Sequence, residues 1–164
     1  MLKYDSISPI FQGYKMNTYE ALDVAHAILS YQSMSHKKLQ KLCYYAQTWS
    51  YGVTGNPLMH SHFEAWIHGP VTPELYSTYK AYGWESIPKT ESFPESMSED
   101  TDVKKFLDEI FRIYGDMSGD QLELLTHDES PWLKARNDLP AYIPSNNRIS
   151  EQDMIEFCQE KLAE

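Results

Sequence analysis

The chain has 164 residues, of which 41% are hydrophobic, and its aromatic residues are 4 Trp, 12 Tyr and 6 Phe. This composition suits one folded domain and excludes disordered, collagen-like and disulfide-rich proteins. The net charge of −10 is concentrated in residues 83–164, where 8 basic and 19 acidic residues give −11, against +1 from 6 basic and 5 acidic residues in 1–82; because a nucleic-acid-binding protein needs a basic surface, no nucleic acid is expected as a partner. No apolar run approaches the ~18 residues of a membrane span and the start lacks a signal-peptide pattern, so a cytoplasmic protein with no membrane partner is expected.

The first half of the chain is predicted to begin with two helices. Asn17 or Thr18 can cap a helix that ends near residue 32. Ser35 can cap a second, longer helix, which the glycines at positions 52 and 55 are expected to stop. Apolar side chains recur along this second helix at steps of three and four, so they face one way: Leu39, Leu42, Cys43, Ala46 and Trp49. Both cysteines of the chain, the second being Cys158, fall at such apolar positions and are interpreted as reduced core thiols.

A change from helical to period-two spacing predicts a small β element. Residues 57–68 alternate in polarity, which indicates a short β-hairpin there. The next segment, Gly69-Pro70-Val71, is expected to be a tight turn, because glycine tolerates positive φ and proline fixes its own φ. A third helix is expected to start at Thr72-Pro73 and to end at Gly83.

The second half is predicted to be helical apart from a loop at residues 84–97. Serines mark four helix starts, since a serine hydroxyl can accept a hydrogen bond from a first-turn amide: Ser98, Ser118, Ser130 and Ser150. Gln121 completes a capping-box pattern with the second of these serines. The expected fold is mainly α, a single compact helical domain of about six to seven helices with a small β-hairpin. It spans residues 17–164, behind an N-terminal extension at residues 1–16.

A series of short motifs follows a specific order between residues 18 and 157. In chain order they are Leu39-Gln40-Lys41-Leu42, Tyr44-Tyr45-Ala46-Gln47 with Trp49, Glu64-Ala65-Trp66, His68-Gly69-Pro70-Val71, Pro73-Glu74-Leu75-Tyr76, Leu124-Leu125-Thr126-His127 and Pro131-Trp132. In order and spacing they resemble the Panacea-domain family, which includes SocA-like antitoxins and the phage-associated protein GepA. The pair Leu-x-Lys-Leu and Ala-Trp-x-x-Gly-Pro-Val carries most of the specificity, because its parts are individually common but their order and spacing are not.

The resemblance implies a role in a toxin–antitoxin system. Family members neutralise a toxin that is usually encoded beside them, either by binding it directly or by delivering it to a protease. The expected partner is therefore a cognate toxin protein from an adjacent gene, with a protease as a second partner. The resemblance implies no cofactor and no enzymatic activity.

Most of the motif residues are expected to serve the fold as core or turn residues: Leu39, Leu42, Tyr45, Trp49, Trp66, Gly69, Pro70, Val71, Tyr76, Pro131 and Trp132. Trp66, on the predicted strand beside a helix, is assigned to the core. Lys41 is the exception, since it places a charge within an apolar motif. It is expected either to bind a carboxylate or a carbonyl of the nearby turn, or to pack its aliphatic stem and reach solvent with its amine.

A histidine-rich segment offers an alternative from a different class of protein. On a strand, His60, His62 and Glu64 would share one face, with His68 close in sequence. Two imidazoles and a carboxylate are zinc-ligand chemistry, so the alternative function is a small hydrolase or metalloprotein. Two histidines on an exposed hairpin face are more often ordinary surface, however, and no distant fourth ligand stands out. The antitoxin interpretation is therefore preferred.

Two groups of residues are candidates for contact with a partner protein. Four tyrosines fall off or at the edge of the apolar stripes, and tyrosine is favoured at interfaces: Tyr44, Tyr51, Tyr79 and Tyr82. The acidic second half would attract a basic partner. Its candidates lie on the last helix and at the start of the fourth: Glu156, Glu160 and Glu164, and Glu99, Asp100 and Asp102.

Overall fold

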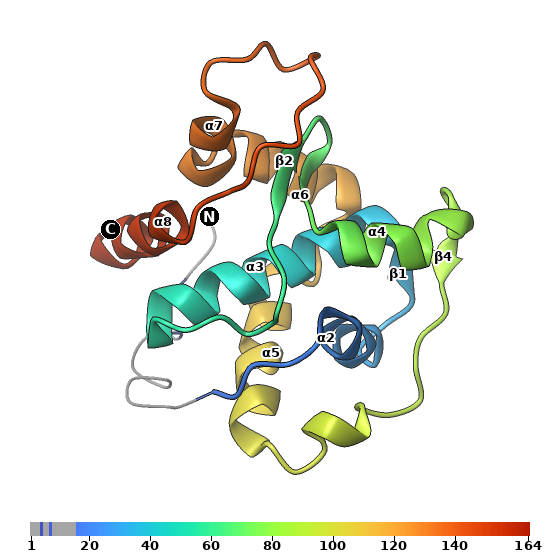
Figure 1. Cartoon of the computed structure of the whole chain (residues 1–164). Helices are drawn as coiled ribbons and strands as arrows, with labels where there is room; N and C mark the ends of the chain where they lie inside the picture. Colours follow the sequence, from blue (N-terminus) through green and yellow to red (C-terminus); the bar gives the residue numbers. More distant parts are fainter. Residues whose placement is uncertain (1–3, 5–6, 8–15) are drawn as a thin grey trace.

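The computed structural model describes residues 4, 7 and 16–164 (Figure 1). Within these residues the fold is mainly α, which confirms the predicted fold class. The α-helices are α2 (Ala21–Leu29), α3 (His36–Thr54), α4 (Pro73–Tyr79), α5 (Thr101–Tyr114), α6 (Gly119–His127), α7 (Ser130–Arg136) and α8 (Glu151–Ala163), joined by short 3-10 helices η1 (Lys80–Tyr82) and η2 (Glu95–Met97). None of the helices in this part of the chain has the length and apolarity required to cross a bilayer.

Four short strands form two antiparallel pairs in the described residues. Strand β1 (Met34–Ser35) pairs with β4 (Ser86–Ile87), with Met34 opposite Ile87. Strands β2 (Glu64–Trp66) and β3 (Gly69–Val71) form a hairpin in which Ala65 lies opposite Pro70. All four strands lie in the segments that connect helices.

Helix α3 runs through the middle of the molecule, and α2, α4, α5, α6 and α8 pack around it (Figure 1). Ser35 caps its start by accepting a hydrogen bond from the Lys38 amide, and Gly55 ends it with a φ of 76°. The predicted apolar stripe of this helix is fully buried. Gly52 does not end the helix but lies inside it. A Cβ at position 52 would be 2.4 Å from the Cβ of Cys158, so the glycine lets α8 approach α3 closely.

The β-hairpin is shifted towards the C-terminus from its predicted place at residues 57–68. It spans residues 64–71, while residues 57–63 form no strand and contribute one isolated bridge, between Met59 and Tyr19. The segment Gly69-Pro70-Val71 is strand β3 rather than a turn. Gly69 still needs its freedom, because it follows the two-residue loop with a φ of 104°.

Several helix starts differ by a few residues from the predicted ones. Glu20 stands at the start of α2, three or two residues after the predicted caps. Asp100, not Ser98, caps α5, and Glu129 precedes α7 so that Ser130 already belongs to the helix. Several polar side chains near each start could cap it, and local sequence does not choose among them. The capping box of α6 and the serine cap of α8 are present as predicted.

The predicted N-terminal extension at residues 1–16 lies mostly outside the described residues. Tyr4, Ile7 and Met16 are described, and all three are buried. The ring of Tyr4 stacks on Trp49 with the centroids 5.0 Å apart. Both cysteines are buried and unpaired.

Candidate functional site

The end of the hairpin is held onto α3 by two buried polar side chains. Gln40 bonds the backbone of Thr72 both ways, since its amide donates to the Thr72 carbonyl at 3.3 Å and its carbonyl accepts from the Thr72 N–H at 3.0 Å. Lys41 is 1% exposed and its Nζ donates to the carbonyl of Pro70 at 3.2 Å. Burial lowers the pKa of Lys41 to about 7, and the charge of Glu123 opposes this shift. Of the roles expected for Lys41, the structure shows the carbonyl anchor.

Two further buried polar residues hold neighbouring segments, and sequence reasoning assigned neither a role. Gln47 accepts hydrogen bonds from both backbone N–H groups of residues 58–59, each at 2.9 Å. Arg136 is 2% exposed and donates to the carbonyl of Ala65 at 3.1 Å and to two carbonyls of the following loop at 2.8 and 2.5 Å. Nothing in the local sequence marks either residue, since each has other polar residues beside it on its helix and its partners are distant groups that the fold brings near.

Six motif residues line a groove of about 690 Å³ between the start of α3, the hairpin, α4 and the start of α6. They come from separate parts of the sequence, which the fold brings together. We call this feature the aromatic groove, and the residues that characterise it are Lys37, Lys41, Trp66, Val71, Tyr76, Lys80, Trp84 and Asp120.

Aromatic rings form the apolar side of the groove. The Trp66 ring meets Tyr76 edge-on with the centroids 4.9 Å apart, and its Nε1 donates to Glu64 at 2.8 Å. Trp66, expected in the core, is partly exposed, because on this three-residue strand Ala65 faces the core and its two neighbours face away. Tyr76, expected on the inner side of α4, is 40% exposed, and Trp84 is 90% exposed. The motif residues Trp66 and Tyr76 therefore contribute to a surface rather than to the core.

The groove is locally basic. Lys37 and Lys80 each contribute a positive charge to its lining, against one negative charge from Asp120, while burial lowers the pKa of Lys41 to about 7. Lys37 is ion-paired, with its Nζ 2.9 Å from Asp120 and 2.7 Å from Glu123. This balance contrasts with the net charge of −10 of the whole chain.

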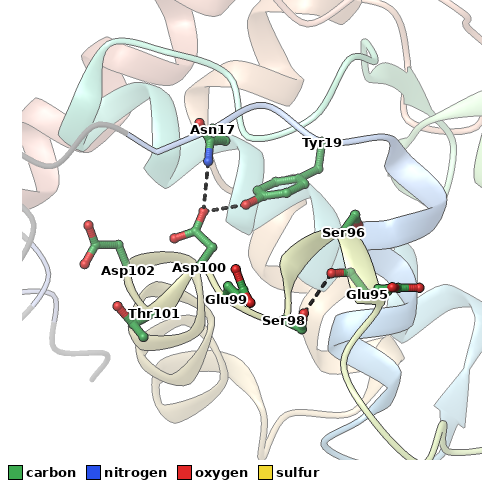
Figure 2. A pocket seen from close by; sticks show the side chains of 9 residues that line it. All are labelled: Asn17, Tyr19, Glu95, Ser96, Ser98, Glu99, Asp100, Thr101 and Asp102. Atoms are coloured by element: carbon green, nitrogen blue, oxygen red, sulfur yellow. Dashed lines mark hydrogen bonds between the residues drawn. The ribbon is translucent and has the colours of Figure 1, made fainter.

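A second hollow of about 680 Å³ lies at the start of α5 and is strongly acidic (Figure 2). Its best-connected carboxylate is that of Asp100, which accepts hydrogen bonds from the Tyr19 hydroxyl, from the Asn17 amide at 3.4 Å and from the Val103 N–H at 3.1 Å. Burial, and then the hydrogen bond to Asp100, raise the pKa of Tyr19 to about 12. We call this feature the acidic pocket, defined by Asn17, Tyr19, Glu95, Glu99, Asp100 and Asp102.

The four predicted metal ligands do not form one cluster, so that ligand set is wrong. His62 pairs with Glu64 at 2.8 Å, and His68 pairs instead with Glu123 at 3.2 Å. Residues 60–62 form no strand, so the alternation that placed His60 and His62 on one face does not apply. In the described part of the chain, no three His, Cys, Asp or Glu side chains are grouped to hold a metal ion.

Three of the four tyrosines expected at the edge of the core are buried in it, which corrects that expectation. Tyr44 is 1% exposed, and Tyr51 and Tyr79 are each 7% exposed, while Tyr82 is 37% exposed. The reason for the first two is the position of α3, because neighbouring helices surround it over residues 38–51. On α8, Glu160 is exposed, and Glu156 lies 3.4 Å from Lys134. Tyr82 and these two glutamates are therefore still able to meet a partner.

Comparisons with known proteins point to one family. The profile described as "Antitoxin SocA-like, Panacea domain" matches residues 39–133 of the chain. Antitoxin SocA of Caulobacter vibrioides (strain NA1000 / CB15N) is 30% identical over 109 residues, which cover 60% of this chain and 58% of that protein. The chain therefore matches a little over half the length of this curated relative. No solved structure gives a significant match. The matched segment contains the defining groove residues from Lys41 to Asp120.

Proposed function

The chain belongs to the antitoxin SocA-like, Panacea-domain family, and from this membership we propose that it is an antitoxin that neutralises a cognate protein toxin by direct binding. The family match over residues 39–133 carries the proposal, because it includes both the motif of α3 and the motif of the hairpin. The similarity to Antitoxin SocA supports the same role. The toxin is proposed to be the product of an adjacent gene, and its neutralisation requires a complex rather than catalytic turnover.

The test is a titration of the toxin with the purified chain. The product of each neighbouring gene is first expressed alone to find one that arrests growth, and then expressed together with this chain to find rescue. In vitro, inhibition of the toxin should saturate at a fixed molar ratio, because each bound chain occupies one site. Full inhibition by a small fraction of an equivalent would contradict a binding mechanism.

A second experiment distinguishes direct binding of the toxin from its delivery to a protease. Direct binding leaves the lifetime of the toxin in cells unchanged or longer. Delivery shortens it, and the shortening disappears when the protease is deleted. Measuring the toxin half-life with and without the chain therefore distinguishes the two mechanisms.

A further inference from the structure

The aromatic groove combines exposed rings with a local excess of positive charge. We propose that it is the docking site for an extended segment of the partner protein in which a large apolar side chain stands next to acidic ones. The identification of that partner as the toxin rests on the proposed function, whereas the chemistry of the groove does not.

The aromatic rings of the groove are exposed to solvent. Trp84 is 90% exposed and Tyr76 is 40% exposed, and both line the same hollow as the partly exposed Trp66. Covering such side chains removes a large apolar area from water, and Trp and Tyr are the residues that most often dominate binding energy at interfaces. A large apolar side chain is therefore the part of an occupant that would gain most from this hollow.

The groove carries positive charge although the protein as a whole is acidic. Lys37 shares its charge with two carboxylates at 2.9 and 2.7 Å. Lys80 is exposed and forms no ion pair with any described residue, so it is the cation that an incoming carboxylate would meet. The starts of α3 and α6 adjoin here, since a Cβ on Gly119 would lie 3.2 Å from the Lys38 backbone nitrogen. Their dipoles add to the positive potential.

The groove is also held in shape before anything binds. Its floor is α3, and hydrogen bonds of 3.0 to 3.3 Å made by the side chains of Gln40 and Lys41 tie the end of the hairpin to that helix. A site whose walls are fixed by the core loses little conformational entropy when a segment docks. An extended segment with acids and one large apolar residue fits this hollow better than a basic segment, which would meet the lysines.

The test selects ligands without using the toxin. A displayed library of random 12-residue peptides is panned on the full-length chain, and enriched peptides are synthesised and titrated. We expect acidic residues beside a Trp, Phe, Leu or Ile in the enriched sequences. Lys80→Glu and Trp84→Ala should each weaken their binding by ~10-fold, as hot-spot changes do. Lys105→Glu, an equally exposed lysine on α5, is the matched control and should bind like the parent.

Several results would overturn the proposal. These are no enrichment, enrichment of basic peptides, or binding that neither groove variant changes while both melt like the parent. A dimer of the chain in solution that Trp84→Ala dissociates would also overturn it, because the occupant would then be a second copy. Since no toxin is used, a failed selection leaves the neutralisation result intact, and failed neutralisation leaves the selection intact.

Discussion

The aromatic groove and the acidic pocket have nearly the same volume, about 690 and 680 Å³, but they are built differently. The floor of the groove is a central helix, and buried side chains tie the hairpin to it. The pocket is lined by the start of α5, by Asn17 and Tyr19, and by the segment before α5, in which Glu95 and Glu99 are exposed. One carboxylate there, that of Asp100, has a structural role as a helix cap.

Because of this difference, the two surfaces are expected to affect different steps of partner binding. A hollow that the core holds in shape can set how long a partner stays bound, because its contacts form without further ordering. Exposed carboxylates act over a distance and chiefly change how fast a partner arrives. Changes beneath the groove should therefore cost stability, and changes around the pocket should leave the fold intact.

The largest effect is expected from Arg136, which supports strand β2 next to Trp66. Arg136→Met removes the donor to the carbonyl of the buried Ala65 and to two carbonyls of the next loop, whose residues are exposed. The free energy of unfolding should fall by ~3 kcal/mol, given ~1–3 kcal/mol for the unpaired buried carbonyl and the loss of two further hydrogen bonds from a charged group. Urea unfolding followed by circular dichroism measures it. Arg148→Met, at an exposed arginine, is the control and should change it by less than ~0.5 kcal/mol.

A buried carboxylate provides the contrast to the exposed acids of the pocket. Glu129 is 7% exposed and accepts a hydrogen bond from the Tyr45 hydroxyl at 2.7 Å. Burial raises the pKa of Glu129 from 4.5 to about 7, with Asp128 adding to the rise and Tyr45 and Lys161 opposing it. Between these two values the folded chain holds a proton that the unfolded chain has lost. Its contribution to stability is therefore greatest below the unfolded pKa and is lost as the pH rises to about 7.

Glu129→Gln should remove this pH dependence, because glutamine keeps the hydrogen-bond acceptor and does not titrate. Relative to the variant, the parent should lose up to ~2 kcal/mol of unfolding free energy between pH 5 and pH 7, since one pKa unit corresponds to ~1.4 kcal/mol. Melting temperatures at four pH values give the comparison. Glu160→Gln, at an exposed position of α8, controls for the lost charge. Parallel curves for Glu129→Gln and the parent would show that Glu129 is ionised throughout.

Removing one hydrogen-bond acceptor from each hollow allows a direct comparison of their effects on stability and on binding. Gln40→Leu removes the acceptor of the buried Thr72 N–H beneath the groove, and should cost ~2 kcal/mol. Asp100→Ala removes the cap of α5 in the pocket and should cost ~1 kcal/mol. Gln40→Leu should also weaken binding to the groove, whereas Asp100→Ala should not. Equal losses of stability with equal losses of binding would mean that the two hollows do not differ in kind.

The sequence predicted the features that depend on local spacing. The apolar stripe of α3, the capping box at Ser118 and the cap at Ser150 need only neighbours three or four residues away, and all are present. The roles of Gln47 and Arg136 depend on carbonyl and amide groups brought near by the fold, so no local pattern predicts them.

The errors at the candidate site have the same origin. Tyr44 sits off the apolar stripe of α3 and would be exposed on a surface helix, but α3 is surrounded and the ring is 1% exposed. Trp66 is the opposite case. A large apolar residue on a strand is expected in the core, but Trp66 faces the groove. Periodicity shows which residues share a face, and only the packing shows whether that face is covered.

The smallest effect on stability, and the sharpest separation of the two surfaces, is expected from charge reversal at the pocket. Glu95→Lys with Glu99→Lys leaves the Asp100 cap in place and changes only exposed side chains, so the free energy of unfolding should stay within ~0.5 kcal/mol of that of the parent. If the toxin presents a basic surface beside its acidic docking segment, association should slow several-fold and dissociation should change little. Trp84→Ala in the groove should speed dissociation and change the association rate little.

Surface plasmon resonance at three salt concentrations measures both rates. The association rate of the parent should fall with salt, because exposed charges are screened over ~8 Å at physiological ionic strength. A flat salt dependence in the parent, with an unchanged association rate in the reversed variant, would reduce the acidic pocket to a solvated face and leave recognition to the groove.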